Sequence, residues 1–176
     1  KMALRKASSY SKKKVGAFTR RSSVKKKAYI KTIPPKVVTK YCMGKNDVSK
    51  LKHQLTLVSC ENAQLRQNAI ESCRQYLHKE LNEKFTGDFY FRIVPYPHHI
   101  QRENRMLTGA GADRMSTGMQ LSFGVSMNNA AILKPGSKIF FIAVPNEKAV
   151  IFTREILDKI KSKLPCRTKV LYEFVK

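Results

Sequence analysis

Residues 134–165 read KPGSKIFFIAVPNEKAVIFTREILDKIKSKLP, and this stretch decides the fold class. Residues 134–137 place proline and glycine at turn positions, so 130–133 and 138–144 are predicted to form a β-hairpin. Pro145 and Asn146 then start a helix that Pro165 ends. One helical face carries the residues spaced three or four apart, namely Ala149, Thr153, Ile156, Leu157, Ile160 and Leu164.

Further elements lie upstream and downstream of this stretch. Residues 55–59 and 89–94 alternate as strands, and residues 169–175 alternate as a last strand. Asn62 is predicted to cap a helix that runs to Leu81, and its apolar face comprises Leu65, Ala69, Cys73, Tyr76, Leu77 and Leu81. The order β-α-β, long loop, ββ, α, β predicts an α+β domain with two helices packed on one mostly antiparallel sheet.

The composition fits one domain with a basic tail. The chain has 176 residues, a net charge of +23 and 42% hydrophobic residues, enough for a core. Residues 1–45 hold fifteen lysines and arginines and no acid. We therefore expect a basic N-terminal extension over 1–45 and the α+β domain over 46–176. The longest apolar run, 139–144, is far too short to span a bilayer, and no secretory signal follows the N-terminal lysines.

The extension is a candidate RNA-binding arm. Self-repulsion favours an extended chain until a polyanion neutralises it. Tyr10, Phe18, Tyr29 and Tyr41 are interleaved with the bases, so aromatic rings could stack on unpaired bases while their neighbours hold phosphates. The expected phosphate contacts are Lys12, Lys13, Lys14, Arg20, Arg21, Lys25, Lys26 and Lys27. The alternatives are a solvated tail that aids solubility or nuclear import, and a membrane-surface segment, which the missing apolar stripe disfavours.

Residues 98–119 form a long segment with features of a functional loop. Four of the eight glycines fall within 109–124, and no P-loop motif is present. Arg102, Arg105 and Arg114 are suited to forked phosphate contacts, although three solvated arginines are the simpler alternative. His98 and His99 point to opposite faces of a strand, which disfavours a shared metal ion.

The cysteines form no metal-binding or disulfide pattern. Cys42, Cys60, Cys73 and Cys166 include no CxxC pair and show no regular spacing. We expect reduced, mostly buried thiols.

Several motifs resemble one known family. Residues 94–119 read VPYPHHIQRENRMLTGAGADRMSTGM, and 121–124 read LSFG. Shorter matches are YCMG at 41–44, the 64–81 helix, KPGSK at 134–138 and LPCR at 164–167. These resemble the universal large-subunit ribosomal protein family called L-sixteen in bacteria and L-ten-e in archaea and eukaryotes, in its archaeal form.

The resemblance implies a fold of the α/β-hammerhead type that packs on large-subunit rRNA beside the A-site tRNA. A loop over about 102–118 would reach toward the peptidyl transferase centre, with Arg102 and Arg105 at its base. The residues within it would be Gly109, Gly111, Asp113, Arg114 and Gly118. Besides the bases of the extension, the expected rRNA contacts are His98, His99, Arg102, Arg105, Lys134 and Lys138.

The implied role is structural, because peptide-bond chemistry belongs to rRNA. We expect a cytoplasmic ribosomal protein that contacts rRNA, tRNA and neighbouring ribosomal proteins, and no enzyme, cofactor, metal ion, membrane or small-molecule substrate. The alternatives are a free-standing basic RNA-binding or chromatin-type protein and an enzyme acting on RNA. Asp113, Glu103 and His98 form no recognisable catalytic constellation, which disfavours the enzyme.

Overall fold

The computed structural model describes residues 6–11, 16–19, 30, 32–45, 51–104 and 123–175. Two long helices and eight strands make up most of these residues. In chain order the elements are η1 (Ala7–Tyr10), β1 (Cys42–Gly44), β2 (His53–Ser59), β3 (Ala63–Arg66), α1 (Gln67–Phe85), β4 (Tyr90–Ile93), β5 (His99–Glu103), β6 (Val125–Leu133), β7 (Lys138–Val144), α3 (Glu147–Ile160), η4 (Lys161–Lys163) and β8 (Thr168–Phe174). The predicted α+β class is confirmed.

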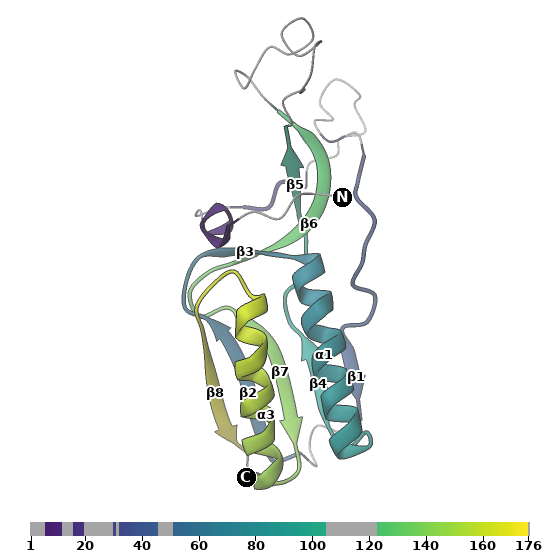
Figure 1. Ribbon diagram of the computed structural model, residues 1–176, viewed down its shortest axis with the longest axis vertical. Helices are drawn as coiled ribbons and strands as arrows, with labels where there is room; N and C mark the ends of the chain where they lie inside the picture. The colour runs from purple at the N-terminus through teal and green to yellow at the C-terminus, as the bar shows by residue number, and fades with distance from the viewer. Residues whose placement is uncertain are drawn as a thin grey trace, which may run out of the picture.

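The strands form two antiparallel sheets instead of one. One sheet has the order β1-β4-β7-β2-β8, and the other has the order β3-β6-β5. In Figure 1 both helices lie in front of the five-stranded sheet, and the three-stranded sheet extends above them. The main core therefore lies between the helices and one face of the larger sheet.

Side chains of alternate strand residues fill that core. Leu55 of β2 faces Ile142 of β7, which in turn faces Phe91 of β4, and all three are fully buried. Leu77 of α1 and Ile160 of α3 belong to the same buried cluster and are also fully covered. The predicted apolar face of the second helix is thus confirmed, and the helix spans Glu147–Ile160.

The predicted start of the first helix was wrong. Residues Ala63–Arg66 form strand β3, and the helix begins only at Gln67. Ala63–Arg66 pairs antiparallel with residues 130–133 of β6. Hydrogen bonds to this distant strand therefore satisfy backbone groups that were expected to lie in the first turn of a helix capped by Asn62. Leu65 is buried from this strand, and Ile70 joins Cys73, Leu77 and Leu81 on the buried face of the helix.

The predicted hairpin over residues 130–144 was also wrong. The turn is present, because the Ser137 amide donates to the Lys134 carbonyl at 3.0 Å. However, β6 pairs with β3 and β5, whereas β7 pairs with β2 and β4. The Gly136 amide donates to the Ser59 carbonyl at 2.7 Å, and the Ser59 amide donates to the Ser137 carbonyl at 2.9 Å. These bonds hold the turn beside the end of β2. Because β6 belongs to the three-stranded sheet and β7 to the five-stranded sheet, the turn connects the two sheets.

Two further expectations need correction. The start of the long segment is not irregular, because His99–Glu103 forms β5 on the edge of the three-stranded sheet. The thiols are not mostly buried: Cys42 and Cys60 are exposed and Cys166 is half-buried, although all four are free. Only Cys73 lies in the core, where burial raises its pKa to about 11.

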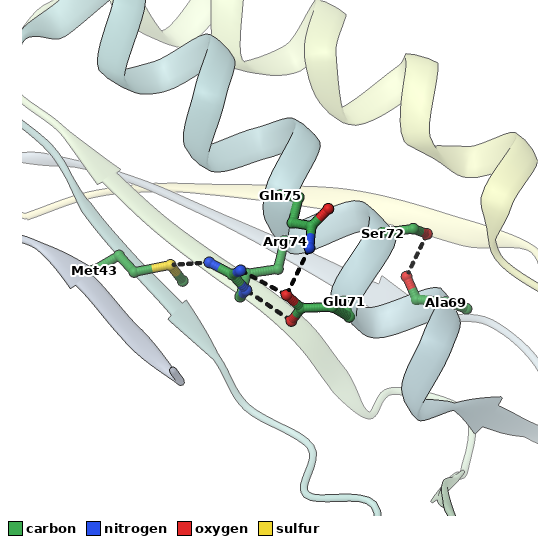
Figure 2. Close-up of polar contacts among 6 residues, drawn as sticks. All are labelled: Met43, Ala69, Glu71, Ser72, Arg74 and Gln75. Atoms are coloured by element: carbon green, nitrogen blue, oxygen red, sulfur yellow. Dashed lines mark hydrogen bonds and ion pairs between the residues drawn. The ribbon is translucent and has the colours of Figure 1, made fainter. Parts of the chain in front are cut away.

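An ion pair on α1 braces the helix against the edge strand β1. Figure 2 shows Arg74 between Glu71 and Met43. Its Nε donates to Glu71 Oε2 at 2.8 Å and its Nη2 donates to Oε1 at 2.6 Å, while Nη1 lies 3.5 Å from the Met43 sulfur. Gln75 Nε2 also donates to Glu71 at 3.0 Å. Arg74 is therefore neutralised by Glu71 within the fold.

Glu71→Gln is expected to lower the free energy of unfolding at neutral pH by about 1.5 to 3 kcal/mol, because it removes charged hydrogen bonds of a mostly buried pair. Arg74 holds the pKa of the Glu71 carboxyl below its ordinary value. The stabilisation is therefore present above the unfolded pKa, near 4.5, and is lost as the pH falls through the lower folded pKa. Urea unfolding at a series of pH values measures this difference.

Glu83→Gln is the matched control for Glu71→Gln. Glu83 pairs with Lys79 on the same helix, but both side chains are more than 60% exposed and 3.8 Å apart. We expect this exposed pair to contribute less than about 0.5 kcal/mol. Equal losses in the two variants would contradict a bracing role for the Glu71 pair.

Candidate nucleic-acid interface

Five of the expected rRNA-contacting residues lie in the part of the chain that the structure describes. His98 is exposed directly before β5, and His99 is the buried first residue of that strand. Arg102 is exposed on β5, one residue before the strand ends. Lys134 and Lys138 are exposed at the two ends of the turn that connects the sheets. His98 and His99 differ in exposure as expected for neighbours on opposite sides of an extended chain.

Arg102 lies in a corner between two aromatic rings. Its guanidinium carbon is 4.3 Å from the centroid of Phe18 and 4.2 Å from that of Phe123. The two rings are 6.0 Å apart at 65°. Cation–π attraction holds the guanidinium in this corner, so the direction of its N–H donors is restricted before any ligand arrives.

The same corner joins three separate segments of the chain. Phe18 comes from the N-terminal region, Arg102 from the end of β5, and Phe123 from the residues before β6. Gly124 follows Phe123 at φ +78°, and a Cβ there would lie 2.9 Å from the Glu103 backbone. Only glycine allows the two strand ends to approach this closely. The corner therefore marks the root of segment 105–122.

Backbone hydrogen bonds add residue 18 to this site. The Phe18 amide donates to His99 Nδ1 at 2.8 Å, and the Ile100 amide donates to the Phe18 carbonyl at 3.1 Å. The ring of His99 is buried, so its Nδ1 serves as an internal acceptor. His99 thus has a structural partner, and its expected contact with rRNA stays a prediction.

Phe18→Ala is expected to loosen this junction, since it removes one of the two rings beside Arg102. A cation–π contact is worth about 0.5 to 2 kcal/mol, so the Ile100 amide should exchange with deuterium roughly 2- to 30-fold faster. Residue-resolved hydrogen exchange of the full chain measures this. Phe85→Ala is the control, because Phe85 is a half-buried ring in edge-to-face contact with Phe152, and it ends α1 at the end of that helix farthest from β5 (Figure 1). Equal acceleration at Ile100 in both variants would contradict a local anchor.

Residues 34–37 are held against Gln67 and strand β6 by side-chain amides. Gln67 Nε2 donates to the Pro35 carbonyl at 3.1 Å, and its Oε1 accepts the Val37 amide at 3.2 Å. Asn129 Nδ2 donates to the Pro34 carbonyl at 3.2 Å. Pro34 and Val38 are buried. The paired asparagines 128–129 were a missed signal, because asparagine is disfavoured in strands unless its amide has a specific partner.

Tyr10 provides another anchor. It is 9% exposed, its hydroxyl accepts a hydrogen bond from Arg66 Nη1 at 3.1 Å, and the Arg66 guanidinium lies 5.7 Å from its ring centroid. Tyr10 and Phe18, which were expected to stack on RNA bases, therefore pack on the chain itself. Ile30 is also buried, at 2% exposure. Along the sequence, these anchors flank the basic clusters at 12–14 and 20–27.

The structure does not bring all the expected contacts together. Arg102 faces Ser126 at the start of β6, whereas Lys134 follows the last residue of β6 and lies about 26 Å farther along an extended chain. Several expected contacts lie outside the described residues, namely Lys12, Lys13, Lys14, Arg20, Arg21, Lys25, Lys26, Lys27, Arg105, Gly109, Gly111, Asp113, Arg114 and Gly118.

A sequence comparison decides the family. The sequence profile described as ribosomal protein L16p/L10e matches residues 18–171, most of the chain. The chain belongs to the ribosomal protein L16p/L10e family. The matched region begins at Phe18, so it includes the Arg102 corner as well as both sheets and both helices.

Three curated relatives from archaea show the extent of the similarity. The chain is 39% identical over 172 residues to the large ribosomal subunit protein uL16 of Sulfolobus acidocaldarius, covering 96% of this chain and 93% of the relative. It is 38% identical over 174 residues to the uL16 of Methanococcus maripaludis, covering 97% and 94%. It is 36% identical over 146 residues to the uL16 of Thermofilum pendens, covering 82% and 86%.

Membership in the L16p/L10e family decides whether the chain is an enzyme. The family consists of ribosomal proteins and not of enzymes, so the chain is not an enzyme. Within the described residues, His, Cys, Asp and Glu side chains form no group of three or more that could hold a metal ion. Neither helix in that part of the chain is long and apolar enough to span a membrane.

Proposed function

We propose that this chain is a structural constituent of the large ribosomal subunit in the cytoplasm, where it binds large-subunit rRNA and neighbouring ribosomal proteins. The observation that carries the proposal is the L16p/L10e match over residues 18–171, together with curated relatives named as large-subunit proteins. A net charge of +23 supports an RNA partner, because phosphates release counterions when lysine and arginine bind them.

The finer proposal places the chain beside the A-site tRNA, with the loop over about 102–118 directed toward the peptidyl transferase centre. Its support is the geometry at the root of this loop. Arg102, Phe18 and Phe123 close the root, and Gly124 allows the two strands to meet there. A fixed root would hold a loop in one direction without a catalytic role for the protein.

Sedimentation of the native chain from cell lysate tests the ribosomal assignment. We expect the chain to sediment with large subunits and to remain there after a high-salt wash. A free-standing RNA-binding or chromatin-type protein would instead be released by the wash or sediment apart from the subunits.

Arg105→Ala and Arg114→Ala test the loop. Arginine forks hold phosphate oxygens in pairs, so each variant should impair late subunit maturation or tRNA accommodation in a replacement strain. The free energy of unfolding of the free protein should change by no more than about 0.5 kcal/mol, the usual range for surface substitutions. The measurements are subunit profiles, translation rate and thermal unfolding. Normal profiles and translation rates in both variants would contradict the loop proposal.

A further inference from the structure

The five-stranded sheet has one covered face and one open face. Met43, Phe91, Ile142 and Leu55 lie in one cross-strand row and belong to the cluster shared with α1 and α3. The two helices lie on the same side of the sheet in Figure 1. The next row therefore points away from both helices, because neighbouring strand residues alternate between faces.

That outward row crosses all five strands. Its members are Cys42, Arg92, Phe141, Thr56 and Leu171, each directly paired with the next. Cys42, Arg92 and Leu171 are exposed and Phe141 is half-buried, whereas Thr56, between Phe141 and Leu171, is buried. Together with Tyr90, these residues define what we call the open face. Among the described residues, no helix or strand covers it.

The open face combines aromatic rings with cationic side chains. Tyr90 and Phe141 contact each other with ring centroids 6.1 Å apart, and both rings are half-buried. Arg92 is the direct cross-strand neighbour of Phe141. At the other end of the face, Lys138 and Lys169 flank Val58 on β7 and β8. Glu173 is the one acid on these outward rows, so the face is net positive.

This composition fits an unpaired nucleic-acid strand. Proteins hold unpaired RNA by stacking bases on aromatic rings of an open sheet and pairing the phosphates with cations. Protein–protein interfaces are depleted of lysine, whereas Lys138 and Lys169 are both exposed on this face, on either side of Val58. The charges and rings therefore favour RNA as the occupant.

We propose that the open face binds an unpaired segment of RNA. Bases stack on Phe141 and Tyr90, and Arg92, Lys138 and Lys169 hold the adjoining phosphates. This proposal rests on the proposed function, which supplies rRNA as the partner, and it adds a second contact surface on the opposite side of the large sheet from both helices.

Photochemical crosslinking tests the contact directly. Large subunits that retain the full chain after a high-salt wash are irradiated with ultraviolet light, and crosslinked peptides are mapped. We expect nucleotides attached to the peptides that contain Tyr90 or Phe141. If the chain is not retained, the ribosomal assignment fails and the open face proposal fails with it. If the chain is retained but these peptides are unmodified or are joined to another protein, only the open face proposal is overturned.

Variants of the full chain provide a second test against purified large-subunit rRNA. Arg92→Gln should reduce the magnitude of the negative slope of log K against log salt by about 0.7 to 0.9, the value for one phosphate contact. Arg154→Gln is the matched control, since Arg154 is an exposed arginine on the helix side, over the Tyr172 ring. It should leave the slope unchanged. Equal slope changes in the two variants would overturn the proposal.

Tyr90→Leu separates stacking from charge. Loss of one base stack should weaken binding by about 5- to 150-fold at constant salt, without changing the salt slope. Thermal unfolding of the same variant identifies any loss of folding. Unchanged affinity in a folded Tyr90→Leu protein would overturn the stacking contact.

Discussion

Replacing six lysines of the basic extension by glutamine is expected to weaken the salt dependence of binding to large-subunit rRNA. The magnitude of the negative slope of log K against log salt should fall by about 4 to 5. The replaced residues are Lys12, Lys13, Lys14, Lys25, Lys26 and Lys27. Each phosphate contact releases counterions and contributes about 0.7 to 0.9 to this slope. Proteins with six to ten such contacts lose about 10³- to 10⁵-fold in affinity between 50 and 200 mM salt, so the change is readily measured.

The six substitutions are designed to keep the anchors of the extension. Tyr10, Phe18 and Ile30 remain in place, so the contacts with Arg66, His99 and Arg102 should persist. Deletion of the whole segment would remove these contacts together with the charge, and the two effects could not be separated.

The matched control removes the same charge elsewhere. It replaces six exposed lysines outside the extension, namely Lys52, Lys79, Lys84, Lys148, Lys159 and Lys163. We expect a clearly smaller change in slope for this control. Equal changes would mean that phosphate contacts are not concentrated in the extension.

Local patterns predicted the elements that depend on nearby residues. The patterns in residues 138–164 predicted β7 and the start and buried face of α3 correctly, because the apolar run and the spacing of Ala149, Thr153, Ile156 and Ile160 are properties of one short segment. The predicted end at Pro165 was wrong, since α3 ends at Ile160 and the 3-10 turn η4 follows it. The final strand was predicted within one residue at each end. Helix α3 buries one continuous face, which periodicity detects well.

Elements that depend on distant partners were missed. Strands β3 and β5 exist because β6 pairs with both, and nothing within 63–66 or 99–103 identifies that partner. The hairpin prediction failed for the same reason, since the turn at 134–137 is compatible with either sheet. A short segment with helical spacing, such as 62–66, becomes a strand when a long-range ladder is available.

The candidate site was predictable in composition but not in geometry. Basic clusters and arginines on the glycine-rich segment are enough to indicate RNA binding from residue types alone. The internal roles of Tyr10 and Phe18 were not visible, because aromatic residues between lysines suit both base stacking and packing on Arg66 or Arg102. Cation–π pairing between distant segments leaves no periodic signal in the sequence.

Leu77→Ala is expected to lower the free energy of unfolding by about 2 to 5 kcal/mol, which is a large part of the stability of an ordinary domain. Leu77 is fully buried on α1 and belongs to the cluster that also contains Leu55, Phe91 and Ile160. Truncation removes apolar burial and leaves a cavity, because strands and a second helix surround the site and limit its collapse.

Lys79→Ala on the same helix is the control for Leu77→Ala, because its side chain is 70% exposed and its partner Glu83 is 3.8 Å away. Alanine is the better helix former, so this variant should change stability by no more than about 0.5 kcal/mol. Urea unfolding of the full chain, followed by circular dichroism, measures both variants. An unfolding midpoint that falls for Lys79→Ala and not for Leu77→Ala would mean that the faces of α1 are reversed, and the assignment of the open side of the sheet would fail with them.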